Sequence, residues 1–265
     1  MTKLDKKTGK PRLEPKSGFN QEEQLFIFQS YLNQKEIQLH FNVGSLGFLP
    51  ANDEGHVDAL AIALSIGENP FLINPGQEFY QKENSWKKYF TGTLANNTIR
   101  VNLKDQAEWI KPFTWMNQFK TTILGKKADN KVVKVKAQHD GYKNLGVNHL
   151  REIIFEKSKN LIWINDTIEC RKSGFNFIEI PFHFHPKTFV KQNNSINYQV
   201  SDENDNLLNL IIDKKLKTQM VKGQIIPQIL GWHSESLDKK EPCTTIYCTA
   251  LIEQTITFQS ILLIK

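Results

Sequence analysis

Short runs in which apolar and polar residues alternate recur along almost the whole chain. In residues 36–43 every second residue is apolar, and His40 lies on the polar face, where we expect it to be solvated. Further runs follow, separated by clusters of Asn, Asp, Gly, Pro and Lys; they are residues 25–32, 131–137, 151–157, 161–170, 175–185, 195–200, 207–213, 244–253 and 255–264. This pattern predicts an all-β fold, a large two-layer antiparallel β-sandwich.

The domain organisation follows from the same pattern. Residues 60–66 and 71–73 are apolar runs that suit buried strands and are too short to span a membrane. Residues 109–124 are ambiguous, because their large apolar residues recur at helical spacing. No repeat and no linker-like tract follows residue 20, so we expect a basic irregular tail at 1–17 and one sandwich domain at 18–265.

Charge is concentrated at the start of the chain. The net charge is +6, and residues 1–16 hold six basic and two acidic residues, so about +2 (6 − 4) remains for the rest. The tail is expected to be a solvated end, and a mildly basic body is compatible with an acidic ligand. Basic and aromatic residues do not interleave as in nucleic-acid readers, so no nucleic acid is expected as a partner. No apolar segment of a signal peptide is recognisable after MTKLDKKTGK.

The stretch from Glu54 to Thr98 carries the main candidate chemistry. Polar side chains stand at the ends of three apolar runs, namely Glu54, His56 and Asp58, then Asn74, then Asn96 and Asn97. In an extended segment, i, i+2, i+4 spacing points the first three to one side, which suits a divalent metal or several sugar hydroxyls. A polar loop in which Asp58 binds backbone amides explains the same residues.

Three other groups of polar side chains have simpler explanations beside functional ones. Arg151 belongs to a predicted hairpin, where it would either clamp a substrate carboxylate or form a cross-strand ion pair. His183 and His185 would bind zinc only with a third ligand, so half-exposed structural histidines are expected. The three cysteines show no CxxC spacing, and buried free thiols are expected at Cys243 and Cys248.

Taken in order, these motifs resemble the C-terminal β-sandwich domain of the heparinase II/III-like polysaccharide lyase family. The HxHADAL loop, the DPG strand end and the TxAHNTV segment of that family correspond to residues 54–60, 74–76 and 93–99. Shorter matches continue at 105–106, 140–142, 149–151 and 183–186. The resemblance runs from about residue 18 to 190.

The resemblance implies a two-part lyase in which an α/α toroid precedes the sandwich and an acidic, uronic-acid-containing polysaccharide (heparin/heparan sulfate- or alginate-like) lies between them. β-Elimination needs a neutralised uronate carboxylate, a base for the C5 proton and an acid for the leaving oxygen. The resemblance implies catalytic roles for His56, Tyr80 and Tyr89, and polysaccharide contacts by Glu54, Lys87, Lys88 and Arg151. It also implies the periplasm or cell envelope as the location.

The residues that correspond to the family's zinc ligands are largely replaced. The family holds zinc with His, Asp and His; His56 keeps the first, while Asn74 and Asn96 replace the others. Neutral amides are poor zinc ligands, so a degenerate site with no tightly bound zinc and no other cofactor is expected. Glu54 replaces the histidine that faces substrate in the family.

The helical toroid has no counterpart in the 265 residues. One hypothesis is therefore a fragment or partner subunit of a lyase, with the toroid on a separate chain and this chain inactive by itself. The alternative is a non-catalytic carbohydrate-binding or scaffolding sandwich, and a third hypothesis is an unrelated sugar-processing sandwich enzyme. No membrane span is expected in any of them.

Overall fold

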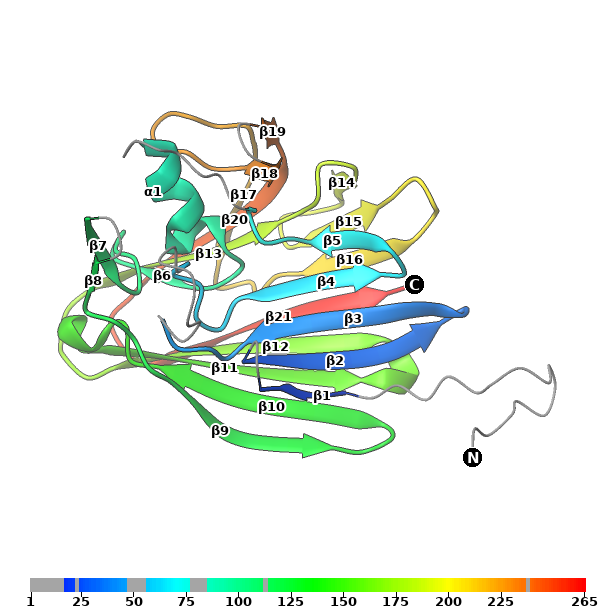
Figure 1. Cartoon of the computed structure of the whole chain (residues 1–265), viewed down its shortest axis with the longest axis horizontal. Helices are drawn as coiled ribbons and strands as arrows, with labels where there is room; N and C mark the ends of the chain where they lie inside the picture. Colours follow the sequence, from blue (N-terminus) through cyan, green and yellow to red (C-terminus); the bar gives the residue numbers. More distant parts are fainter. Residues whose placement is uncertain (1–16, 22–23, 47–55, 77–84, 112–113, 237–238) are drawn as a thin grey trace.

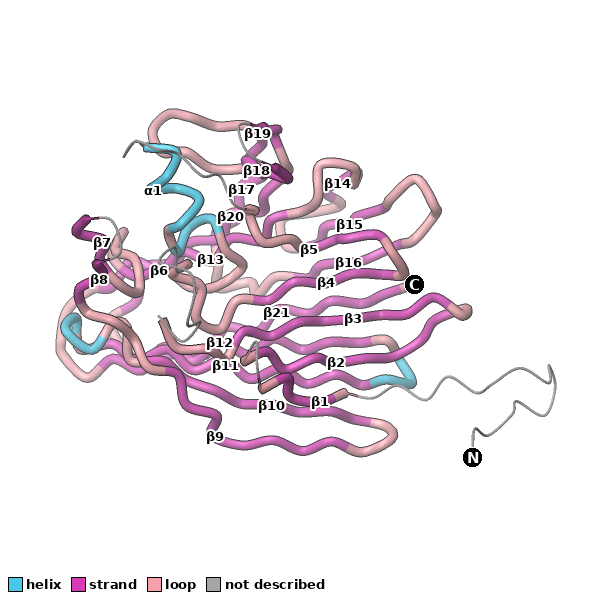
Figure 2. Tube along the Cα trace, viewed as in Figure 1, coloured by secondary structure: helices cyan, strands magenta, loops and turns pink. Residues whose placement is uncertain are grey.

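Antiparallel strands make up most of the computed structural model, which describes residues 17–21, 24–46, 56–76, 85–111, 114–236 and 239–265 (Figures 1 and 2). Nearly all of the predicted basic tail, together with Glu54 and Tyr80, lies outside these ranges. Every pairing between the named strands is antiparallel, as the alternating sequence pattern predicts. No helix within the described ranges is long and apolar enough to cross a membrane.

One layer begins with a five-stranded meander in which neighbours in sequence are neighbours in space. Its strands are β1 (Gly18–Asn20), β2 (Leu25–Leu32), β3 (Lys35–Asn42), β4 (Ile62–Ile66) and β5 (Asn69–Leu72). Every second residue of β3 is buried, and His40 lies among the half-buried ones, as the alternation predicts. A four-stranded sheet of order β17-β20-β13-β6 extends this layer, because Leu72 at the end of β5 bridges to Phe184. Its strands are β6 (Arg100–Val101), β13 (Asn176–His183), β17 (Lys217–Lys222) and β20 (Thr244–Ile252).

The second layer is an eight-stranded sheet of order β14-β15-β16-β21-β12-β11-β10-β9. Its strands are β9 (Thr121–Ala128), β10 (Val132–His139), β11 (Val147–Glu156), β12 (Leu161–Cys170), β14 (Phe189–Gln192), β15 (Asn197–Ser201), β16 (Leu207–Ile211) and β21 (Ile256–Ile264). Figure 1 shows the five-stranded meander lying over this sheet, and one continuous core of buried apolar side chains joins them. The predicted two-layer sandwich is therefore confirmed.

Small elements gather at one end of the sandwich. These are α1 (Ser85–Thr91), the pairs β7 (Glu108–Lys111) with β8 (Thr114–Met116) and β18 (Trp232–Ser236) with β19 (Lys239–Pro242), and the 3₁₀ turns at Thr93–Ala95 and Lys143–Leu145. A third 3₁₀ turn, Lys157–Lys159, lies at the opposite end beside the β9–β10 turn, where Lys157 N donates to Lys131 O at 2.9 Å. In Figure 1 α1, β7 and β8 lie at the left of the molecule, away from the turn between β9 and β10. The ambiguous residues 109–124 thus form strands. Cys243 and Cys248 are buried free thiols, as predicted.

Candidate functional site

The segment that begins at His56 is fastened to elements on both sides of it. Val57 N donates to Thr91 O at the end of α1, at 3.0 Å. Gln106 fixes Ala59 from the other side, because its Oε1 accepts from Ala59 N at 2.8 Å and its Nε2 donates to Ala59 O at 3.1 Å. His56 is half-buried at the start of this segment. From His56 onward, the loop that the sequence singled out is therefore held in place by hydrogen bonds to its backbone.

Asp58 is the acidic neighbour of His56 in this segment. Burial raises the pKa of Asp58, while the positive charge of His56 and a hydrogen bond from the side chain of Asn42 act in the opposite direction. An imidazole next to a partly buried carboxyl is a combination that can transfer protons. His56 and Asp58 are thus the residues of this segment that are suited to acid–base chemistry.

The next residue but one, Leu60, has a strained backbone that its neighbours hold in place. Its φ is +60°, in the left-handed region that a branched residue rarely adopts. Leu60 N donates to Asn42 O at 2.9 Å, and Arg151 Nη1 donates to Leu60 O at 2.7 Å. The turn into β4 therefore depends on a guanidinium from the opposite sheet.

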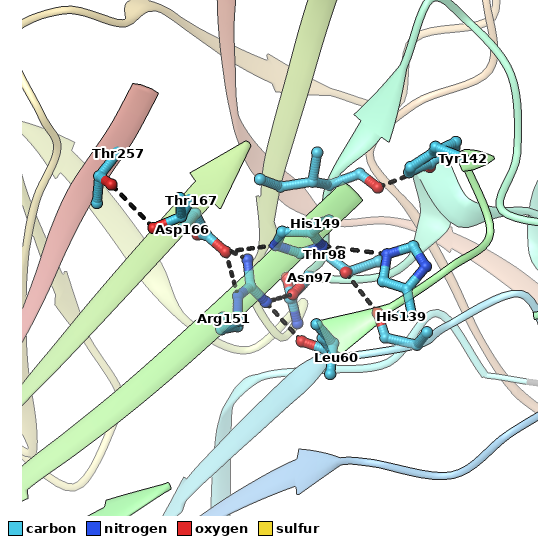
Figure 3. A network of polar contacts seen from close by, with 12 residues as sticks. Leu60, Asn97, Thr98, His139, Tyr142, His149, Arg151, Asp166, Thr167 and Thr257 are labelled. Atoms are coloured by element: carbon cyan, nitrogen blue, oxygen red, sulfur yellow. Dashed lines mark hydrogen bonds and ion pairs between the residues drawn. The ribbon is translucent and has the colours of Figure 1, made fainter. Parts of the chain in front are cut away.

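That guanidinium is completely enclosed, and Figure 3 shows its contacts. Arg151 in β11 faces Asp166 in β12, with Nε to Oδ1 at 2.7 Å and Nη2 to Oδ2 at 3.0 Å, and its exposed fraction is 0%. Its Nη1 also donates to Asn97 O at 2.6 Å. The predicted contact between Arg151 and a polysaccharide is therefore wrong, and the cross-strand ion pair is confirmed. A bidentate, buried pair is a structural anchor between the two layers.

Two buried histidines extend this network (Figure 3). Gly141 N donates to His139 Nδ1 at 3.2 Å, so His139 carries its proton on Nε2 and donates to His149 Nδ1 at 3.2 Å. His149 then carries its proton on Nε2 and donates to Asp166 Oδ1 at 2.7 Å. Burial lowers the pKa of both histidines, and the chain of bonds is complete with both rings neutral.

Asn97 joins the three segments that the sequence motifs mark. Its Nδ2 donates to Ile62 O at 2.8 Å and to Ile73 O at 2.9 Å, and its Oδ1 accepts from His183 N at 2.7 Å. The side chain therefore connects β4, the end of β5 and β13 in the interior. The sequence analysis placed weight on Asn96 and missed this role of Asn97.

The residues at the family's zinc positions do not fit a zinc ion. Asn96 is buried and its Nδ2 donates to Gly92 O at 2.9 Å, whereas Asn74 is exposed. No hydrogen bond joins either asparagine to His56 in the part of the chain that the structure describes. One imidazole and two amides are a weak donor set for zinc. The prediction that tightly bound zinc is absent stays a prediction, and no chemical step is derived through a metal.

The turn that contains Asn74 has a structural explanation. Ser234 N donates to Pro75 O at 2.8 Å, and Gly76 forms a parallel bridge with Ser234. Gly76 has a φ of +87°, and a Cβ there would lie 1.6 Å from Ser234 O. Only glycine permits this close approach of two backbones.

The two histidines of the FHFH strand end have different surroundings. His183 is fully buried; its Nδ1 bonds Thr245 Oγ1 at 2.8 Å and its Nε2 donates to Leu94 O at 3.0 Å. A structural role is confirmed for His183, although it is not half-exposed. His185 is half-buried, with its ring centroid 5.7 Å from that of His233. Among the described residues, no three His, Cys, Asp or Glu side chains are grouped to hold a metal.

A pocket of about 480 Å³ opens beside α1 and is a candidate site. Three lysines line it, Lys87 and Lys88 from α1 and Lys104 from the loop after β6. An indole, two carboxylates and several amides and hydroxyls complete its walls, from Trp115, Asp105, Glu108, Gln106, Asn117, Asn144, Thr91 and Tyr142. Its size and mixed apolar and polar lining are typical of small-ligand sites, and its lysines suit an anion.

The predicted polysaccharide-contacting residues Lys87 and Lys88 thus lie at this pocket, whereas Tyr89 faces the interior. Tyr89 is buried, and its hydroxyl donates to Trp232 O and accepts from Trp232 N, both at 3.3 Å. Burial raises the pKa of Tyr89, which makes it a poor base. The structure therefore gives Tyr89 a packing role. Sequence reasoning missed Lys104 and Trp115, which the β7–β8 hairpin and its neighbouring loop bring to α1.

Fold and site together define a class of protein: a two-layer antiparallel β-sandwich with a lysine-lined pocket at one end. The chain belongs to the family described as Heparinase II/III-like, C-terminal, whose match covers residues 22–254. The curated proteins gave no significant sequence match.

Solved structures show the same fold. Heparan sulfate lyase HepC from Pedobacter heparinus superposes with a TM-score of 0.74 at 13% identity, covering 97% of this chain and 37% of that one. A heparinase III that is the BT4657 gene product gives 0.74 at 12% identity over 97% and 37%. A further heparinase III gives 0.72 at 13% identity over 97% and 38%. This chain therefore spans less than two-fifths of the length of the structures that it matches.

Proposed function

We propose that this sandwich domain binds an acidic, uronic-acid-containing polysaccharide in the pocket beside α1, and that it does so as part of a polysaccharide lyase. The observation that carries the proposal is the pocket itself, in which three lysines, Lys87, Lys88 and Lys104, outnumber two carboxylates and meet an indole and several amides. Lysines balance carboxylate or sulfate charge, and an aromatic ring offers an apolar face to a sugar. Family membership and the names of the structural neighbours support the choice of ligand.

In the proposed lyase, the catalytic roles are divided between this domain and an α/α toroid. A cationic pocket stabilises the charge that develops on a uronate carboxylate when its neighbouring C5 proton is removed. His56 and Asp58 supply the acid–base chemistry from this domain, because Val57 between them is bonded to Thr91 at the pocket wall. The remaining catalytic groups come from an α/α toroid, on the same polypeptide or on a separate chain.

Binding is tested by calorimetric titration of the full chain with heparan sulfate, alginate and an uncharged polysaccharide. We expect the acidic polymers to bind and the uncharged one not to bind. K87Q/K104Q should weaken binding roughly tenfold, at about 0.5–1 kcal/mol for each lysine, since Lys87 is half-buried and Lys104 is exposed. The matched control is K187Q/K214Q, which removes the same charge from two exposed lysines that do not line the pocket. Equal affinities for both double variants would refute the pocket as the site.

A non-catalytic binding domain is the second candidate function. Two predicted functional residues, Tyr89 and Arg151, are buried and engaged in structure, which favours it. Ultraviolet absorbance of the unsaturated product separates the two functions. Turnover by this chain that H56A abolishes would establish a catalytic domain. Binding without turnover, in the presence and absence of a toroid domain from a family member, would establish a binding domain.

A further inference from the structure

Exposed lysines lie at both ends of the strand that forms the edge of the larger sheet, one of them close in sequence to the pocket. Trp115 and Asn117 line the pocket, and Lys120 follows three residues later, just before β9 begins. Lys120 is exposed, and its backbone N–H donates to Asp140 Oδ1 at 2.7 Å, which fixes the backbone just before β9. Further along are the exposed lysines of β9 and of its turn to β10, which are Lys126, Lys127 and Lys131.

This hairpin holds a large share of the protein's positive charge. Residues 120–136 contain six lysines and one acidic residue, a net +5 (6 − 1) where the whole chain has +6. The acidic residue, Asp129, accepts the backbone N–H groups of Lys131 and Val132, both at 2.8 Å, and so closes the turn. Among the residues that the structure describes, one of the six lysines, Lys134, forms an ion pair, with Glu152 at 2.9 Å. The charge of the hairpin is thus mostly available to an external anion.

The hairpin also has the shape that an extended ligand requires. β9 is the last strand of its sheet and pairs with β10 alone among the described strands. Its eight residues extend about 27 Å at the usual rise per residue. In Figure 1 it runs from the end of the molecule that carries β7 and β8 toward the opposite end. A ligand that follows this edge must be a polymer, because one or two sugar rings cannot reach from the pocket to the turn.

We propose that the β9–β10 hairpin is a second, extended binding surface for the acidic polysaccharide whose other part occupies the pocket. The inference rests on the proposed function of the pocket. Binding at one place raises the effective concentration of the polymer at the other, so a long polymer binds more tightly than a short one without any new contact in the pocket. The added affinity is electrostatic and falls as salt screens it. Lysines on an edge strand also prevent pairing with other chains, but that role alone predicts no dependence on polymer length.

The test compares a tetrasaccharide with a hexadecasaccharide of heparan sulfate, or of alginate if that polymer is the one that binds. Affinities of the full chain are measured at about 0.05 M and about 0.5 M sodium chloride. The variant K126Q/K127Q/K131Q removes three exposed lysines of the hairpin and leaves the pocket unchanged. The control K187Q/K191Q/K214Q removes the same charge elsewhere and includes Lys191 in β14, the opposite edge strand of the same sheet. K131E, a single change in the turn, is a second test variant in case glutamines on the edge promote association of copies.

We expect the native protein and the control to gain at least tenfold in affinity from the short to the long ligand at low salt, and to lose most of that gain at high salt. The hairpin variant should gain about twofold or less, with its tetrasaccharide affinity unchanged, and K131E should lie between them. Equal gains in the native protein and the hairpin variant would overturn the second surface while leaving the pocket intact. Failure of the native protein to bind either length would instead refute the proposed function.

Discussion

Replacement of Asp166 by asparagine tests the buried network directly, because it removes one charge and almost no volume. The carboxylate accepts from Arg151 Nε at 2.7 Å, from Arg151 Nη2 at 3.0 Å and from His149 Nε2 at 2.7 Å. The amide of an asparagine has one oxygen that accepts hydrogen bonds, whereas the carboxylate has two. The NH₂ group of the asparagine would take the place of the other oxygen and would face an N–H donor there. The guanidinium of Arg151 would then stay in the interior without an opposing charge.

The expected cost is large for a single substitution. Loss of one partner of a buried ion pair costs about 3–5 kcal/mol, against a total unfolding free energy of about 5–15 kcal/mol for a typical domain. Arg151 cannot turn to solvent, since its Nη1 also holds Leu60 and Asn97. We therefore expect D166N to lower the free energy of unfolding by about 3–5 kcal/mol and Tm by roughly 10 °C.

The same pair sets a pH dependence. Burial raises the pKa of Asp166, but Arg151 and His149 outweigh it and bring that pKa to about 2. Because the folded pKa is depressed, the contribution of Asp166 to stability is complete above its unfolded pKa of about 3.9 and is lost as the pH falls toward 2. D166N should lack this particular loss between pH 4 and pH 2.

Urea unfolding, followed by tryptophan fluorescence and circular dichroism, measures these differences. E152Q is the matched control, because Glu152 lies on the same strand as Arg151 and forms a partly exposed pair with Lys134 at 2.9 Å. That change should cost less than about 1 kcal/mol. A loss below about 1 kcal/mol in D166N, or an equal loss in E152Q, would show that the buried network does not hold the layers together.

Three further predictions concern other residues. Burial lowers the pKa of His139, His149 and His183, the last to about 4. The stability that these neutral histidines contribute is therefore complete above about pH 6.5, and it declines below that pH by up to about 1.4 kcal/mol per pH unit and residue. Urea titrations from pH 7 to 5 should show this decline, and a constant free energy of unfolding would contradict it. Y89F should lower the free energy of unfolding by about 1 kcal/mol and leave polysaccharide affinity unchanged. Weaker polysaccharide binding by Y89F would show that Tyr89 contributes to the binding site. Purified protein dialysed against a weak chelator should retain no stoichiometric zinc by elemental analysis; retention would mean that His56 has better partners than two amides.

The strands could be predicted because half-buried strands show alternation in sequence, and β12 coincides with residues 161–170 as predicted. The region of 109–124 could not be predicted in this way, because Trp115 lies in β8, Phe119 in the loop that follows it and Ile123 in β9, so that the helical spacing does not come from one element. The seven-residue α1 was also missed. It buries Tyr89 and Phe90 in a cluster with Trp232, a partner that no local pattern reveals.

The buried network left a signal that the sequence analysis did not use. Asp166 falls in phase with three isoleucines of β12 on its buried face, and His149 and Arg151 fall in phase with Ile153 and Phe155 on that of β11. Charged residues on the apolar face of a strand are costly unless they are paired, so two such strands next to each other predict a buried pair. Lys104 and Trp115 gave no such signal, because the pocket is formed by loops and a short hairpin.

This division of residues changes where the function of the domain should be sought. Arg151, His149 and Asn97 belong to the motifs that carry the family resemblance, yet all three are enclosed and bonded within the protein. In this chain such motifs hold the geometry of the loops at Leu60 and Asn97 rather than contact a ligand directly. The lysines to which we assign polysaccharide binding lie outside the buried network, in α1, at Lys104 and in the β9–β10 hairpin. Substitutions in the network should therefore change stability first, and substitutions of the lysines should change affinity without changing stability.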